Sequence, residues 1–156
     1  MPYGYGQLFE ETASAVTATP SVTLGQRQHY NSVDYVYCYN AGNSQINPGY
    51  GVVCSANSAY SVTLTSVIGD LPFGVVVNAT ATTGTYFWAA QRGIVKLVTA
   101  DNASASAQGQ AFFLDANGTW RHAATGATGS TWAYAARAVG LEGIATASSG
   151  KVFLNI

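Results

Sequence analysis

The side chains most able to do chemistry in this chain are two cysteines and two histidines. Cys38 and Cys54 do not form a Cys-x-x-Cys pair, and His29 and His122 lie far from each other along the chain. Structural zinc sites use ligand pairs at close spacing, so we expect no metal. The cysteines are interpreted as two small buried side chains. A disulfide between them is the alternative, and it would need an oxidising compartment.

The acidic residues and serines do not form a catalytic pattern either. Five of the seven carboxylates lie singly and mostly beside turns, where Asp usually bonds the backbone, whereas a glycosidase needs a carboxylate pair. The sequence contains no Gly-x-Ser-x-Gly elbow and no Gly-x-x-x-x-Gly-Lys-Ser/Thr phosphate loop. We therefore expect neither an enzyme nor a cofactor, and we expect both histidines to be surface or interface residues. The isolated carboxylates are Asp34, Asp70, Asp101, Asp115 and Glu142.

Aromatic residues are the other candidates for ligand contacts. Trp88, Trp120 and Trp132, together with ten tyrosines, could stack against sugars. Aromatic side chains are also favoured in strands and in cores, where they bury a large apolar area. We predict that they lie in the core or in a subunit interface, with a glycan platform as the alternative.

The composition indicates a folded protein with a neutral, hydrogen-bonding surface. Only 8% of the residues are charged, against about 25% in typical soluble proteins. Hydrophobic residues make up an ordinary 48%, so small polar residues such as Ser, Thr and Asn replace the missing charge. A formal net charge of −1 leaves little repulsion between copies, which favours self-association.

The same composition disfavours several partners and locations. The six Lys and Arg residues are scattered along the chain, so we expect no nucleic-acid partner. No apolar run is long enough to span a bilayer, so we expect no membrane partner. Residues 1–6 lack the charged and apolar regions of a signal peptide. We expect the protein to be made and kept in the cytosol unless it leaves as part of a particle.

Short strands separated by turn residues are predicted from residue 23 to residue 156. The segment 33–39 is β-branched and aromatic, with alternate residues on one face. The segment 111–122 is a predicted hairpin, because Asn117-Gly118 supplies the positive φ angles of a tight turn. The other expected strands are residues 52–54, 61–68, 75–77, 86–88, 94–99, 132–139 and 151–156.

This pattern predicts an all-β fold, an antiparallel β-barrel or sandwich of many short strands. We expect residues 23–156 to form one domain. The segment 132–139 is rich enough in Ala for a helix, and we assign it to a strand because Gly-rich segments flank it.

Residues 1–22 are interpreted as an extended N-terminal arm, because no period of 2 or 3.6 runs through them, with one helical turn near residues 8–15 left open. A frayed terminus is the alternative. Tyr3, Tyr5, Leu8 and Phe9 lie in this segment, and large apolar and aromatic side chains gain from burial. These four residues are therefore the candidate contacts with another surface.

The second half of the chain carries a series of short segments of Gly, Ala, Val and aromatic residues. They are residues 71–75, 84–88, 91–95, 103–108, 109–112, 136–138 and 152–154. This series resembles the β-barrel module of tailed-bacteriophage head decoration proteins, also called cement or capsid-stabilising proteins. The resemblance covers residues 71–156 and, more loosely, residues 22–51. The N-terminal arm, the tyrosine-rich strand and the cysteines are not part of that pattern.

The resemblance implies a structural protein on the outer surface of a phage head, made in the cytoplasm of the host bacterium. Such a protein would bind the major capsid protein, often as a homotrimer, and bridge neighbouring capsid subunits. Binding to the assembled shell, but not to free subunits, would favour the shell by linkage and multivalency. The arm would then contact the capsid or a sister subunit. A head-fibre, tail or receptor-binding module that recognises host glycans is the alternative.

Overall fold

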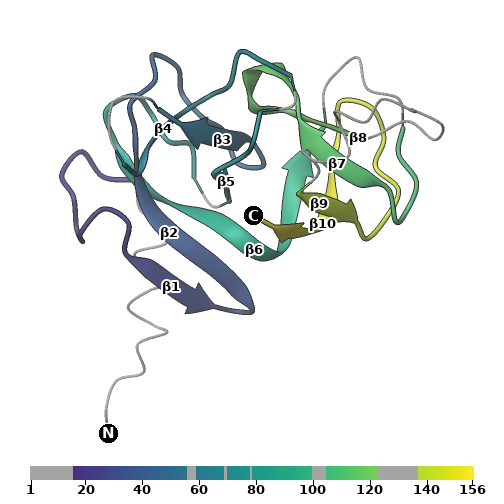
Figure 1. The fold of residues 1–156 in the computed structure, drawn as a ribbon, viewed down its shortest axis with the longest axis horizontal. Coiled ribbons are helices and arrows are strands. Elements are labelled where there is room, and N and C mark those ends of the chain that lie inside the picture. The colour runs from purple at the N-terminus through teal and green to yellow at the C-terminus, as the bar shows by residue number, and fades with distance from the viewer. Residues whose placement is uncertain (1–15, 56–58, 69, 78, 100–104, 123–136) are drawn as a thin grey trace, which may run out of the picture.

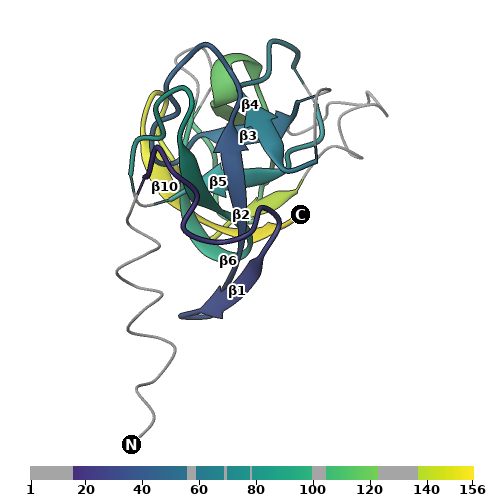
Figure 2. The same ribbon diagram turned by 90° about the vertical axis from the view of Figure 1, so that its left-hand side faces the viewer.

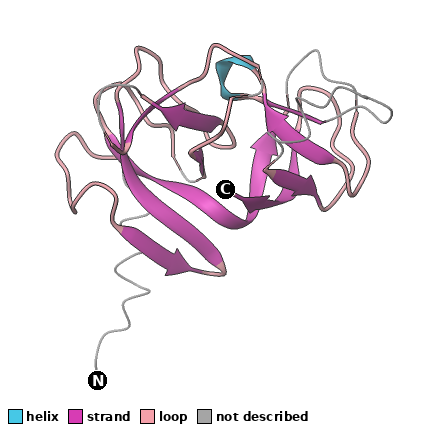
Figure 3. Ribbon diagram, viewed as in Figure 1, coloured by secondary structure: helices cyan, strands magenta, loops and turns pink. Residues whose placement is uncertain are grey.

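The protein folds as a nearly all-β structure (Figures 1 and 3). Ten strands and one short 3-10 turn make up the regular structure of its described residues. No helix in those residues is long and apolar enough to cross a membrane. The computed structural model describes residues 16–55, 59–68, 70–77, 79–99, 105–122 and 137–156.

All ten strands belong to one sheet. They are β1 (Arg27–Tyr30), β2 (Val33–Asn40), β3 (Gly51–Cys54), β4 (Ser61–Thr63), β5 (Gly74–Val76), β6 (Tyr86–Val98), β7 (Ala111–Leu114), β8 (Trp120–His122), β9 (Ala138–Gly140) and β10 (Ser149–Asn155). Their order across the sheet is β1-β2-β4-β3-β5-β6-β10-β9-β7-β8. Because β2 also pairs with β6, the sheet curls back on itself. β1 and the start of β2 project from the barrel as a two-stranded ribbon (Figure 2).

The first ring of the barrel consists of β2, β4, β3, β5 and β6. Each of these strands pairs with the next, and β6 pairs back with β2. So few strands enclose a narrow interior, and Phe87 is the one large ring among its described buried side chains. The buried side chains of this cluster are Val36, Cys38, Ile46, Val52, Val62, Val76, Ala81, Phe87 and Ala89.

The second half of β6 continues into a second curved wall with β10, β9, β7 and β8. A parallel bridge between Thr99 and Trp120 brings β8 back toward the end of β6. The concave side of this wall holds larger side chains, and Trp120 and Phe112 are fully buried there. The wall contributes Val95, Leu97, Phe112, Leu114, Trp120, Ala138, Ile144, Val152 and Leu154 to a second apolar cluster.

The two halves of β6 turn opposite sides of the strand toward this second cluster. Trp88 and Ala90 belong to the cluster in the first half of the strand, and Val95 and Leu97 belong to it in the second half. The change from even to odd positions occurs where the register between β2 and β6 shifts and β6 carries one extra residue. The even-numbered residues of the second half therefore face outward.

The all-β fold predicted from the sequence is confirmed, with local differences. The runs predicted at 86–88 and 94–99 are one strand, β6, because the register shift lets the chain continue through the polar residues between them. The strand predicted over 61–68 ends at Thr63, and Thr65 then bonds Val67 in a turn. β2 and β4 run parallel, whereas the other ladders between described strands are antiparallel.

The hairpin predicted over 111–122 is confirmed. β7 pairs antiparallel with β8, and Asn117 and Gly118 have φ angles of 62° and 79°. The connection is longer than a tight turn, because a 3-10 turn over Ala116–Gly118 is capped by Asp115. The predicted strand at 132–139 overlaps β9 only at its end, and its residues up to 136 lie outside the described residues.

The described part of the predicted arm, residues 16–22, contacts the β domain. Thr17 bridges to Tyr86 at the start of β6. The backbone N–H of Ser21 donates to the Tyr37 hydroxyl at 3.1 Å. The rest of the arm lies outside the described residues, and the boundary between arm and domain stays a prediction.

Gly93→Ala tests the close packing where β6 passes the start of β2. Gly93 has a φ of 114°, and a Cβ there would lie 2.4 Å from the Ser32 carbonyl oxygen and 2.9 Å from the Val33 Cα. Both contacts are with backbone that cannot simply rotate away. We expect the variant to lose about 2–4 kcal/mol of unfolding free energy, measured by urea denaturation.

Gly109→Ala is the matched control for this substitution. Gly109 also has a left-handed φ, 83°, but a Cβ there would meet no atom within 4 Å. The unfolding free energy of this variant should fall by only about 1 kcal/mol, which is the cost of the backbone strain. Equal losses in the two variants would contradict the close packing at Gly93.

Candidate functional site

The four contact residues predicted from the sequence, Tyr3, Tyr5, Leu8 and Phe9, all lie outside the described residues. Their role as contacts stays a prediction.

The two histidines lie in different environments. His29 Nδ1 is 2.6 Å from Asp34 Oδ1, and both side chains are exposed beside the β1–β2 turn. His122 is only 8% exposed and its ring packs edge-on against Phe112. The expectation of a surface or interface position holds for His29 and is wrong for His122, because the inward face of β8 carries His122 into the core.

The described carboxylates hold local structure. Asp115 accepts hydrogen bonds from the Ala116 backbone N–H at 2.8 Å and from Arg121 Nη2 at 2.8 Å, which ties the two ends of the hairpin. Asp70 accepts a bond from the Thr65 hydroxyl. These contacts match the turn roles predicted from the sequence. Within the described ranges, no three His, Cys, Asp or Glu side chains gather as a metal site.

The tryptophans that the structure describes are core residues. Trp120 is fully buried and Trp88 is 4% exposed, so neither can offer a face to a sugar. The sequence predicted the core or a subunit interface for these residues, and the structure places both in the core. Trp132 lies outside the described residues.

The two cysteines are both free thiols. Cys38 is buried in the first ring, where its Sγ donates to the Phe87 carbonyl at 3.6 Å. Cys54 is exposed at the end of β3, so the expectation of two buried cysteines is right for Cys38 and wrong for Cys54. Burial raises the pKa of the Cys38 thiol well above its usual value. Partial loss of surrounding water also raises the pKa of Cys54.

A row of exposed apolar side chains crosses the solvent-facing side of β6, β10 and β9. Ile94 in β6 lies opposite Phe153 in β10, and Phe153 lies opposite Val139 in β9. The three side chains are 57%, 41% and 45% exposed. An aromatic and two β-branched side chains in one cross-strand row form a contiguous apolar strip on the surface, which is typical of a binding surface.

Cationic side chains flank this row on both sides. Lys96 and Lys151 are exposed and directly opposite each other on β6 and β10. On the other side of the row lie Arg92 in β6 and Arg137 beside β9. These four residues are four of the six Lys and Arg residues in the chain. We call the apolar row and its four flanking cations the outer face.

Sequence reasoning missed the outer face because its residues are scattered along the chain. A signal was present in the alternation of charged and apolar residues. Arg92, Ile94 and Lys96 occupy every second position of one segment, and Lys151 and Phe153 do so in another. The sequence does not reveal that these segments are neighbours, which only the β6–β10 register establishes.

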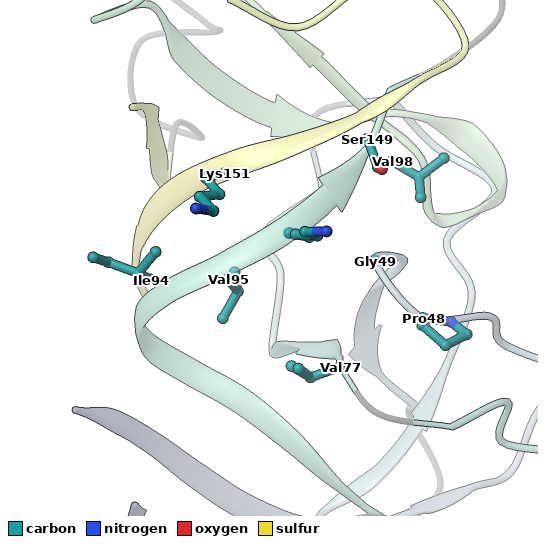
Figure 4. A pocket seen from close by; sticks show the side chains of 9 residues that line it. Pro48, Gly49, Val77, Ile94, Val95, Val98, Ser149 and Lys151 are labelled. Atoms are coloured by element: carbon teal, nitrogen blue, oxygen red, sulfur yellow. The ribbon is translucent and has the colours of Figure 1, made fainter. Parts of the chain in front are cut away.

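A groove borders the outer face along β6. Its volume is about 390 Å³, and β6 and β10 form one side while Pro48 and Val77 lie across from them (Figure 4). Ile94, Lys96 and Lys151 are among the residues that line it. The groove and the outer face therefore make one continuous surface that combines apolar and cationic groups.

Comparison with solved structures shows what this fold is similar to. The fold is similar to that of a phage head-fibre base. This structure is the N base of the head fibre protein gp8.5 in bacteriophage phi29, with a TM-score of 0.55 and 9% sequence identity. The similarity covers 78% of this chain and 94% of that chain. No protein family and no curated protein matches the sequence, so the likeness is one of fold.

The two thiols should differ sharply in reactivity, because the thiolate is the reactive form and must also be reached by the reagent. In the native protein at about pH 8, we expect an aromatic disulfide reagent to modify Cys54 alone. The rate should rise with pH, since the raised pKa leaves little thiolate near neutrality. Unfolding should release Cys38 as a second thiol, and Cys54→Ser should abolish the native reaction. Modification of both thiols in the native state would contradict the burial of Cys38.

Proposed function

We propose that this protein is a non-enzymatic structural component of a bacteriophage head that binds the outer surface of the capsid shell. The fold likeness to a phage head-fibre base, which extends over 94% of that structure, carries the proposal. The sequence resemblance to head decoration proteins supports it independently. Both point to a protein associated with the phage head.

The proposed mechanism is stabilisation of the assembled shell. A protein that binds neighbouring capsid subunits in the shell, and not as dispersed subunits, shifts the assembly equilibrium toward the shell. Many weak contacts over a symmetric particle add up through multivalency. The outer face offers one such contact surface, and the N-terminal arm offers another through Tyr3, Tyr5, Leu8 and Phe9.

A second candidate function is the base of a head fibre. It is favoured by the solved structure that this fold resembles, which is itself a head-fibre base. In that case the chain would attach a further virion component to the head. Glycan recognition receives less support, because Trp88 and Trp120 are buried.

Cryo-electron microscopy of virions that carry this chain tests both candidates. Density for the chain at regular sites across the outer head, bridging capsid subunits, is expected for decoration. Density at the same surface with a further protein extending from it would favour the fibre base. Absence of the chain from the head, with density at the tail or none, would contradict both.

Added to undecorated heads, the protein should raise the temperature at which the shells lose their contents. The reason is linkage, since bound protein stabilises only the assembled state. The shift should increase with protein concentration until the sites are full. A shift of zero at saturating occupancy would contradict stabilisation and would leave attachment as the function.

Removal of residues 1–12 tests the role of the arm. We expect binding to heads, measured by co-sedimentation, to fall at least about ten-fold, because the arm residues supply apolar contact area. The unfolding temperature should stay near that of the full chain, since the truncation leaves Thr17 and its bridge to Tyr86 in place. Normal decoration by the truncated protein would show that the arm makes no essential contact.

A further inference from the structure

The outer face is a surface of defined chemistry, with an exposed apolar row between cations. We infer that it binds the N-terminal segment 8–11 of a second copy of this chain, so that copies associate head to tail. This inference deepens the proposed function, because it assigns the surface through which sister subunits would meet on the head.

The lysine pair indicates an anionic partner. Lys96 and Lys151 face each other across an antiparallel pair, where like charges are destabilising. The nearby Glu142 carboxylate accepts a hydrogen bond from the Lys151 backbone N–H at 2.7 Å. Among the described residues, no ion pair within 4 Å joins a carboxylate to either lysine side chain. A partner carboxylate would therefore remove a repulsion as well as form a contact.

The segment 8–11 supplies the complementary groups. It reads Leu8-Phe9-Glu10-Glu11, and it is the only place in the chain with two adjacent carboxylates. In an extended segment, alternate residues point the same way, so each side would present one apolar and one acidic side chain.

The spacing of this segment matches that of the face. Ile94 and Lys96 are two residues apart on β6, as are Phe153 and Lys151 on β10. An extended segment therefore places an acid over a lysine when its apolar residue lies over the apolar row.

A second copy fits better than the same copy. Thr17 is bridged to Tyr86. The stretch of chain from Thr17 back to Phe9 has as many residues as the stretch of β6 from Tyr86 to Ile94. The chain's own segment would therefore have to run fully taut along β6. It could not run within the sheet, because β2 and β5 pair with β6 on its two sides at Ala90. A second copy meets neither limit.

Such a contact joins two different surfaces, so it is heterologous. Heterologous contacts form closed rings when the rotation between copies closes. A ring of this kind would give the homotrimer that the sequence resemblance implies. It would also present several arms and faces together, which adds multivalency to any contact with the head.

Charge reversal on each side tests the pairing. The face variant is Lys96→Glu/Lys151→Glu, and the arm variant is Glu10→Lys/Glu11→Lys. Each should weaken self-association of the full chain at least about ten-fold in sedimentation velocity, because like charges then meet. The quadruple variant restores opposite charges and should return to within about three-fold of the wild type.

Two controls separate pairing from misfolding and from general charge effects. Lys96→Arg/Lys151→Arg keeps the charge and should associate like the wild type. Arg27→Glu reverses an exposed cation on β1, away from the face, and should also associate normally. Circular dichroism melts should show that every variant is folded.

The outcomes distinguish this inference from the proposed function. A monomeric wild type, or a quadruple variant that fails to recover, would overturn the inference whether or not heads are bound. If the quadruple variant regains self-association but neither it nor the wild type binds heads, the inference is supported and the proposed function is overturned. Weakening of self-association by the face variant alone, with no effect of the arm variant, would show that the outer face meets another part of the sister copy and would also overturn the inference.

Discussion

The barrel depends on β6, the long strand that contributes to both apolar clusters and joins the first ring to the second wall. In its first half, alternate side chains of β6 face the two clusters, with Phe87 and Ala89 on one side and Trp88 on the other. In its second half, only one side is covered by the core. The register shift against β2 allows this change, because one extra residue moves the inward position from even to odd numbers.

The chemistry of the surface follows from this change. Once the core covers only one side of β6, the opposite side chains have to face solvent, and in this chain they alternate between cations and Ile94. Neighbouring β10 repeats the pattern in register, so the individual residues become a row. A chain with so few charges thus concentrates most of its cations on one face.

The buried polar and reactive groups serve to hold the fold together. Asp115 and Arg121 hold the β7–β8 connection, and Cys38 packs as a small side chain inside the first ring. Trp120 fills the second cluster against Gly51, where a Cβ would lie 2.7 Å from its ring. These residue types could do chemistry elsewhere, but here they are held by packing and local hydrogen bonds.

The sequence alone determined the fold class and the hairpin around Asn117, and it favoured the core or a subunit interface for Trp88 and Trp120. These follow from local signals, namely alternation, β-branched and aromatic residues and turn chemistry. Tertiary structure decided the rest: the ring closed by β2 and β6, the parallel β2–β4 pair, and the outer face that joins Ile94 to Phe153. The physical reason is that strand pairing and register are long-range properties. A period of two shows that a residue lies on one side of a strand, and only the packed sheet shows which strand lies beside it and which side meets solvent.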